Sequence, residues 1–372
     1  MSAITEPYAE QALDTIRTTH RQRVTAKFYP TSGDPLDLVV NDGNVTLSEA
    51  WAPHAQVHLS CAGGLDLETL AKLDPRQAPL LEVHAGYIYP GGADDVQLLA
   101  TAVLAERRVV QPGDSLELEA NSEEMLAQDV VWLEATQTKN YAGLREAIEA
   151  LLAYMAGGKQ TLVADFGAKF RADLTTGVEL ERGASVWEVI YHLALQAGRW
   201  LYVGADGTWR CTAKATQAST TSVYLAASGP GSIVTRVDDV LSRNGYYTAA
   251  MVTYTWKDST GADQTMVGTW APPAAAGMKG SGQKTLVLDR RGKASQWGAN
   301  EAARLTVRNM STRGASYQVD AVAAYWLRPG HTVQVTLANG ATVRHICKQV
   351  VFHLGNGSMT VTTREPSNLG EE

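Results

Sequence analysis

Apolar and polar residues alternate over many short stretches of this 372-residue chain. Alternation of this kind is typical of strands with one buried and one solvated face. Residues 333–337, for example, read Val-Gln-Val-Thr-Leu. We therefore expect a mainly β protein, with strands over residues 24–29, 36–40, 57–59, 80–89, 96–105, 116–118, 200–203, 208–212, 233–237, 249–256, 317–321, 333–337, 343–354 and 359–363.

Turn signals separate these stretches. Asn339-Gly340 and Asn356-Gly357 are the strongest short-range signals for tight hairpins. The run Asn-Asp-Gly-Asn at 41–44 and the glycine pairs at 63–64 and 91–92 predict further turns. Many short strands with turns between them favour a barrel or a sandwich.

Three internal stretches change to helical spacing. One, near residues 144–155, carries an apolar stripe and is ended by Gly157-Gly158. In the second, Ser185 precedes Glu188 by three positions, which is a capping box. A third helix is expected over 295–309. The second helix, the strand at 200–203 and its return strand predict a compact α+β unit at roughly 139–215.

Two stretches contain candidate interface residues. Residues 1–20 read as an amphipathic helix or arm with Tyr8 and Ile16 on its apolar face, and such an arm can dock on a neighbour. Residues 257–293 are rich in Gly and Pro and predict loops. Trp270 falls in this second stretch, where few core positions are expected, so it is the third candidate.

One phrase occurs twice. Val110–Ala120 reads VQPGDSLELEA, and 327–338 reads LRPGHTVQVTLA. In each, Pro-Gly forms a turn before an alternating strand. Because each phrase lies late in a β-rich region, one before and one after the α+β unit, we expect a structural duplication.

Composition narrows the class of protein. The net charge of −7 argues against a nucleic-acid-binding surface, which needs clustered Lys and Arg. Cys61, Cys211 and Cys347 show no CxxC spacing, so we expect buried thiols rather than a disulfide framework. No signal peptide is visible, and no apolar run reaches the roughly 18 residues of a membrane span.

The sequence shows no signature of catalysis. It has no GxSxG, P-loop or dinucleotide-binding fingerprint. His54 and His58 have a metal-like spacing, but Pro53 and the surrounding pattern predict a strand without a third ligand. We expect no catalytic residue, no cofactor and no metal, and therefore no enzyme.

The order of these regions resembles a known family, the baseplate hub proteins of phage tails. This family includes T4-type hubs, the N-terminal part of siphophage tail-associated lysins and actinobacteriophage minor tail proteins. The similar stretches are LDPR leading into the strand at 80–89, then LELEANSEEMLAQD, SVWEVIYHLALQAGRWLYVGADGTWR, RVDDVLSRNGYYTAAMVTYTW, LRPGHTVQV and ICKQVVFHLGNGSMTVTTREP.

The resemblance implies two tail-tube-like β-barrel domains and two smaller α+β domains. Its domains would be an N-terminal helix or arm (1–20), a first tube-like barrel (21–135), an α+β domain (136–222), a second tube-like barrel (223–256 and 317–366), an inserted loop–helix domain (257–316) and a flexible tail (367–372).

The resemblance also implies a function. Three chains would form a homotrimeric hub at the virion's tail tip, with six similar barrels adapting a sixfold tube to a threefold tip. Its partners would be the distal tail, tail tube, tape-measure and other tail-tip proteins. DNA would pass through the lumen during genome ejection without specific binding, and assembly would occur in the host cytoplasm.

Two other functions stay open at this point. The protein could be a distal tail or receptor-binding protein whose Trp residues hold cell-wall glycan. It could also be a wall hydrolase, as many hubs carry lytic domains. We disfavour the hydrolase because the chain ends directly after the last expected barrel strand.

Overall fold

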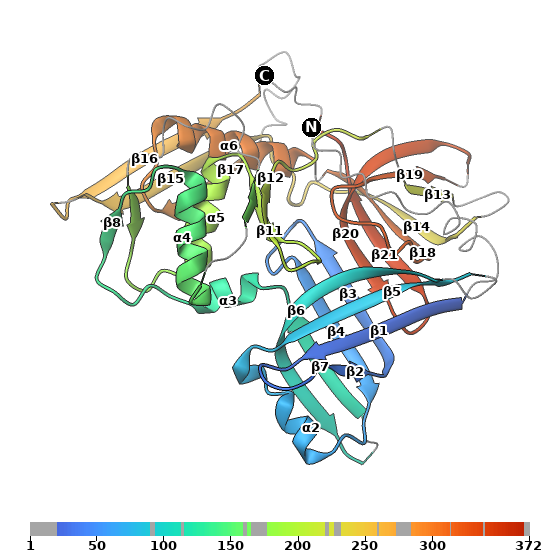
Figure 1. The fold of residues 1–372 in the computed structure, drawn as a ribbon. Helices are drawn as coiled ribbons and strands as arrows, with labels where there is room; N and C mark the ends of the chain where they lie inside the picture. Colours follow the sequence, from blue (N-terminus) through green and yellow to red (C-terminus); the bar gives the residue numbers. More distant parts are fainter. Residues whose placement is uncertain are drawn as a thin grey trace.

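The computed structural model describes residues 21–89, 94–112, 115–158, 162–164, 177–219, 223–226, 232–258, 260–272, 284–312, 314–337 and 339–367. The fold is mainly β, as the alternating pattern predicts (Figure 1). One large sheet of 13 strands dominates, and two smaller units lie together beside it. Tyr8 and Ile16, the glycine pair at 91–92 and the tail from residue 368 lie outside the described residues.

The large sheet contains two sets of five strands, which we call the first and second strand sets. The first set is β3 (Val40–Ser48), β4 (Ala55–Ala62), β5 (Leu80–Ile88), β6 (Asp94–Val110) and β7 (Ser115–Asn121). The second is β14 (Val234–Leu241), β18 (Ala315–Val322), β19 (Thr332–Thr336), β20 (Thr342–His353) and β21 (Ser358–Arg364). Three more strands pair at the ends: β1 (Arg21–Tyr29), β2 (Leu36–Leu38) and β13 (Val223–Ala226).

The two sets have the same strand order and direction. The first runs β3-β4-β7-β6-β5 across the sheet, and the second runs β14-β18-β21-β20-β19. All neighbours within each set are antiparallel. The strands added at the ends differ, because β1 is antiparallel to β5 whereas β13 is parallel to β19.

The registers of the two sets also agree. In β6, Val103 pairs with both β5 and β7, and in β20, Ile346 pairs with both β19 and β21. Each of these strands has a β-bulge two residues later, between Leu104 and Glu106 in β6 and between Cys347 and Gln349 in β20. Such bulges shift register and increase twist, so their matching places indicate a repeated unit rather than two unrelated sheets.

The strands at the outer side of each set repeat a second bulge. In β3 it lies between Val40 and Asp42, opposite β4, and in β14 it lies between Val234 and Arg236, opposite β18. These correspondences pair the residues of the two sets one by one. Val103 corresponds to Ile346, and Val40 corresponds to Val234.

The repeated Pro-Gly phrase does not mark this repeat. The first phrase connects β6 to β7, whereas the second precedes β19, which occupies the place of β5. The counterpart of the first phrase is the connection from His353 to Ser358, which has the same length but the sequence Leu-Gly-Asn-Gly. The expected duplication of strands is found, but the phrase that suggested it was the wrong evidence.

The two sets join into one continuous sheet through β20 and β3. Their buried residues form one hydrophobic core, which runs from Ala26 in β1 to Val361 in β21. In the part of the chain that the structure describes, none of the sheets closes into a barrel. The two closed barrels expected from the resemblance are therefore not confirmed.

The turn expected at 41–44 is wrong. These residues lie inside β3, and Gly43 has φ +150° beside the backbone of His58. A side chain at Gly43 would overlap that backbone, so the glycine serves close strand packing rather than a turn. The helical turns near this region are α2 (Leu67–Lys72) and the 3-10 turn η1 (Pro75–Gln77).

The first smaller unit packs helices on short strands. Its elements are α3 (Glu124–Asp129), α4 (Leu144–Ala156), α5 (Val186–Gln196), β8 (Gln137–Lys139), β9 (Leu162–Ala164), β10 (Val178–Leu180), β11 (Trp200–Val203) and β12 (Trp209–Thr212). Ser185 Oγ accepts the N–H of Glu188 at 3.1 Å, as the capping signal predicts. Gly157 is left-handed at the end of α4, also as expected.

The second smaller unit corrects the loop expected at 257–293. Its elements are β15 (Ala249–Lys257), β16 (Asp263–Trp270), β17 (Thr285–Arg291) and α6 (Gln296–Ser311). β15 pairs with β16 and β17 and not with the large sheet. Gly268, read as a loop residue, lies where α6 approaches β16, and a Cβ there would overlap the backbone of Ala299. The glycine is required by helix–sheet packing.

Candidate assembly interface

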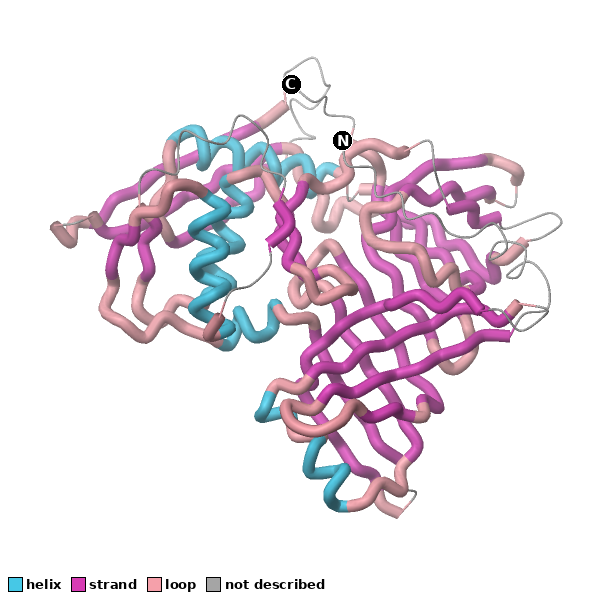
Figure 2. The backbone as a smooth tube through the Cα atoms, viewed as in Figure 1, coloured by secondary structure: helices cyan, strands magenta, loops and turns pink. Residues whose placement is uncertain are grey.

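The join between the two strand sets, which we call the internal junction, is a short antiparallel ladder. Gln349 to His353 of β20 pair with Ser48 to Asn44 of β3. At its centre, Val350 lies opposite Leu47 and Phe352 opposite Val45. All four side chains are buried. Figure 2 shows the sheet continuing from one strand set to the other.

A segment that follows β18 strengthens the internal junction. Residues 323–328 pack against β5 and β6 of the first set and against the neighbouring β1. Tyr325 donates its hydroxyl to Gln22 Oε1 at 2.8 Å, and Arg328 Nη2 donates to the Leu98 carbonyl at 2.8 Å. Tyr87 donates its hydroxyl to the carbonyl of Ala323. The second set therefore covers the first set in two places, with the edge of β20 and with residues 323–328.

A buried ion pair lies at the end of the internal junction. Arg364, the last residue of β21, donates from Nε and Nη2 to the carboxylate of Glu49, which follows β3. Burial would raise the pKa of Glu49, but the charges of Arg364 and Lys214 outweigh burial and hold that pKa below its usual value. Lys214 donates to the carbonyl of Glu49, and Arg364 donates to the carbonyl of Ala215. The ion pair is therefore also bound to the segment that contains Lys214 and Ala215.

Two edges in the described structure correspond to the internal junction but carry no partner strand; we call them the open edges. One is the outer edge of β14, the counterpart of β3. The other is the end of β6 after Leu104, beyond the last residue of β5 that pairs with it. The contrast in exposure is large. Leu241 is 86% exposed where its counterpart Leu47 is 1% exposed, and Val109 is 39% exposed where Phe352 is fully buried.

The open edges carry opposite charges. The end of β6 contains Arg107 and Arg108 beside Glu106, so its net charge is positive. β14 contains Asp238 and Asp239 beside Arg236, which pairs with Asp238 at 2.8 Å, so its net charge is negative. Arg108 has an exposed ion pair with Glu117 at 3.6 Å, which is weak in solvent. Exposed apolar side chains and unpaired backbone groups on one edge are a template for another strand.

An exposed apolar tip lies in the segment that corresponds to residues 323–328. In the first set this segment follows β4 and includes α2. Leu67 at its surface is exposed, as is the neighbouring Val39, whereas Tyr325 and Leu327 in the second set are buried against the first. At the internal junction the second set uses the edge of β20 and residues 323–328. Their counterparts in the first set, the end of β6 and the segment that contains Leu67, are left uncovered.

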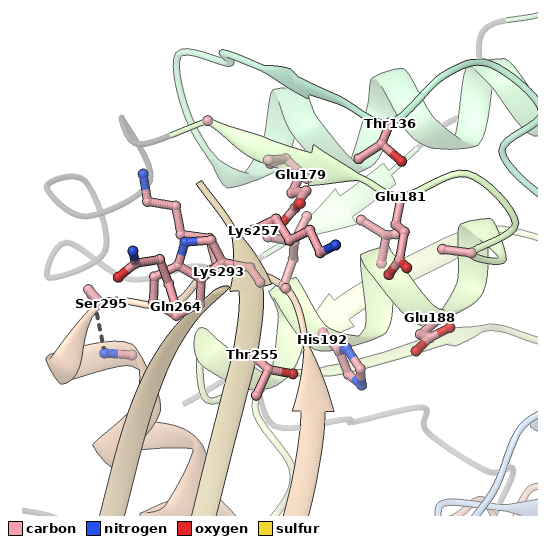
Figure 3. A pocket seen from close by; sticks show the side chains of 18 of the residues that line it. Thr136, Glu179, Glu181, Glu188, His192, Thr255, Lys257, Gln264, Lys293 and Ser295 are labelled. Atoms are coloured by element: carbon pink, nitrogen blue, oxygen red, sulfur yellow. Dashed lines mark hydrogen bonds between the residues drawn. The ribbon is translucent and has the colours of Figure 1, made fainter. Parts of the chain in front are cut away.

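A cleft of about 680 Å³ separates the two smaller units (Figure 3). Glu181, Glu188 and His192 face it from the first unit, and Lys257 reaches in from β15. Burial raises the pKa of Glu179, which also lines the cleft. Trp256 and Trp297 supply aromatic surface. Side chains of both signs therefore line this cleft together with aromatic rings.

The structure separates the histidines considered as metal ligands. His54 is buried against the rings of Trp200 and Tyr202, and burial lowers its pKa to about 4. Its Nδ1 lies 2.6 Å from the Ser48 carbonyl. His58 is exposed on β4. Across the described residues, no group of three or more His, Cys, Asp and Glu is arranged to hold a metal ion.

The candidate interface residues have different outcomes. Trp270 ends β16 and packs partly on the core of the second smaller unit, so its expected loop position is wrong; its role at an interface stays a prediction. Tyr8 and Ile16 lie outside the described residues, so their role at an interface also stays a prediction. Sequence reasoning missed Val109, Val240 and Leu241. The adjacent apolar pair Val240-Leu241, which breaks the alternation at the end of β14, was the available signal.

Comparisons with solved structures find similar folds over nearly the whole chain. A tail protein from Neisseria meningitidis MC58 has a TM-score of 0.64 at 14% identity, with 92% of this chain and 96% of that chain covered. The 43 kDa tail protein of prophage MuSo2 from Shewanella oneidensis has a TM-score of 0.63 at 12% identity, with 93% and 99% covered. This chain has the fold of phage tail proteins.

A third structure extends this tail-protein fold to a secretion apparatus. The E. coli c3393 protein, a type VI secretion component described as similar to the T4 tail proteins gp27 and gp5, has a TM-score of 0.53 at 10% identity, with 95% of this chain and 79% of that chain covered. No protein-family model and no curated protein matches the sequence. Among the helices that the structure describes, none has the length and apolarity needed to cross a membrane.

Proposed function

We propose that this protein is a structural component of a phage tail tip, a homotrimeric baseplate hub without enzymatic activity. The observation that carries the proposal is the repeated strand order and register of the two sets. A chain with two equivalent units forms six of them in a trimer. Such a trimer presents sixfold pseudo-symmetry to a tube and threefold symmetry to a tip.

The proposal assigns a role to each part of the chain. The strand sets, within the proposed tube-like domains 21–135 and 223–256 with 317–366, form the ring around a channel for DNA and the tape-measure protein. The α+β domain (136–222) and the inserted domain (257–316) face other tail proteins, with Trp270 as a contact. The net charge of −7 suits a wall that DNA passes without binding.

Native mass spectrometry tests the trimer directly. We expect the full chain to give a mass three times that of the 40.0 kDa protomer, and averaged electron micrographs of the particle to show six similar lobes around a central opening. A monomer that persists when the tail tube and distal tail proteins are added would overturn the proposal.

The cleft between the smaller units favours a second candidate, recognition of host cell-wall glycan by a distal tail or receptor-binding protein. Aromatic surface at Trp256 and Trp297, together with carboxylates, is the composition of many polar-ligand sites. If the protein is a hub, we expect it to bind no glycan on a glycan array. A signal that Trp256→Ala abolishes and Trp51→Ala, at an exposed residue outside this cleft, leaves intact would favour glycan recognition.

A further inference from the structure

We propose that neighbouring copies of this chain join head to tail by pairing β14 of one copy with the end of β6 of the next, in the register of the internal junction. This inference rests on the proposed trimer and specifies its contact. It derives from the one-to-one correspondence of the two strand sets, in which β6 corresponds to β20 and β14 corresponds to β3. The observed pairing of β20 with β3 therefore serves as the model for the pairing of β6 with β14 between copies.

The correspondence fixes the register. Phe352 of β20 corresponds to Val109 of β6, and Val45 of β3 corresponds to Asp239 of β14. Because Phe352 lies opposite Val45, Val109 lies opposite Asp239 of the next copy. The full antiparallel ladder is Glu106 with Ser242, Arg107 with Leu241, Arg108 with Val240, Val109 with Asp239 and Val110 with Asp238.

The charges of the open edges fit this register. In an antiparallel pair, side chains two positions off the directly opposite residue share a face and lie within reach of long side chains. Arg107 is thereby diagonal to Asp239, and Arg108 is diagonal to Asp238. Each arginine of β6 faces a carboxylate of β14, and no like-charged pair lies directly opposite.

The apolar surfaces fit as well. Leu241 and Val240 are exposed in one copy and become covered by β6 of the next, as Leu47 is covered by β20 at the internal junction. The tip at Val39 and Leu67 then meets the second set of the neighbour, in the way that residues 323–328 meet the first set within one chain. A single contact between two copies therefore buries exposed apolar residues of both copies.

This contact uses two different edges of each copy, so it is heterologous. A heterologous contact produces a closed ring when its rotation closes and an open filament when it does not. Because the internal junction and the contact between copies have the same geometry, successive units turn by the same angle. The proposed trimer contains six units, so it requires a turn of one sixth of a full rotation between successive units.

Engineered disulfides test the register. Val109→Cys with Asp239→Cys places two thiols directly opposite each other, and Cα atoms of opposite residues lie within the range that a disulfide spans. We expect oxidation to give covalent species up to the trimer and no larger on a non-reducing gel. The three native cysteines are buried and do not compete.

The matched control moves one cysteine by a single position. Val109→Cys with Val240→Cys puts the thiols on opposite faces of the sheet, because successive side chains alternate. We expect this variant to show at least tenfold less cross-linked product. Equal cross-linking of both variants, or cross-linking of the control alone, would overturn the register.

A second measurement separates this inference from the proposed function. Leu241→Asp is expected to lower the trimer fraction at least tenfold in native mass spectrometry without changing the melting of the monomer, whereas Leu133→Asp, at another exposed leucine, leaves the trimer intact. A wild-type trimer that neither forms the in-register disulfide nor responds to Leu241→Asp overturns the contact and leaves the hub standing. Absence of any trimer overturns both.

Discussion

Replacement of Arg364 by methionine is expected to destabilise the protein by about 3–5 kcal/mol. The substitution leaves the carboxylate of Glu49 buried without its partner, which is the costly way to break a buried ion pair. It also removes the hydrogen bond from Arg364 to the Ala215 carbonyl. Urea denaturation followed by tryptophan fluorescence measures the loss. Arg108→Met, which breaks the exposed pair with Glu117, is the control, with an expected change below about 1 kcal/mol.

The double variant Arg364→Met with Glu49→Leu separates the charge from the packing. Removing both charges removes the uncompensated carboxylate, so we expect most of the stability to return. A double variant as unstable as Arg364→Met alone would show that packing around the arginine stem, rather than the ion pair, stabilises this end of the internal junction.

The ion pair also predicts a dependence on pH. The folded-state pKa of Glu49 is lower than its usual value of 4.5. The pair therefore contributes its full stability above the unfolded-state pKa and loses it as the pH falls through the folded-state value. Below pH 4.5 the stability of the wild type is expected to fall towards that of Glu49→Gln, because a protonated Glu49 leaves the buried charge of Arg364 without a carboxylate partner, in the same denaturation experiment repeated in acid.

The second large effect is expected from Phe352→Ala, at about 3–5 kcal/mol. Phe352 is fully buried, lies opposite Val45 and contacts Tyr325 at 5.5 Å between ring centroids. The alanine leaves a cavity at the centre of the internal junction. Hydrogen exchange is the sharpest measurement, because the amides of β3 and β20 should lose protection while those of α4 and α5 keep it.

The chain supplies a control for this substitution at the corresponding position. Val109→Ala changes the counterpart of Phe352 in the first strand set, where no partner strand covers it in one copy. We expect less than about 0.5 kcal/mol in the monomer, and a weaker trimer. Equal destabilisation of the monomer by both changes would contradict the assignment of β6 as an open edge.

The three longer helices, α4, α5 and α6, and most strands could be predicted because their signals are local. The Ser185 cap, the left-handed Gly157 and the hairpins at Asn339-Gly340 and Asn356-Gly357 each depend on residues a few positions apart. The errors came where a distant segment decided the outcome. Gly43 and Gly268 read as turn or loop residues, but each lies in a strand because another backbone passes close to it.

The sequence by itself determined that the protein is mainly β and where α4, α5 and α6 lie. Only the tertiary structure decided which segments correspond, because correspondence depends on hydrogen-bond register between strands far apart in the chain. It also decided the candidate interface. Leu47 and Leu241 are leucines at corresponding positions of β3 and β14, and only the presence of β20 beside Leu47 makes it core and leaves Leu241 at the surface.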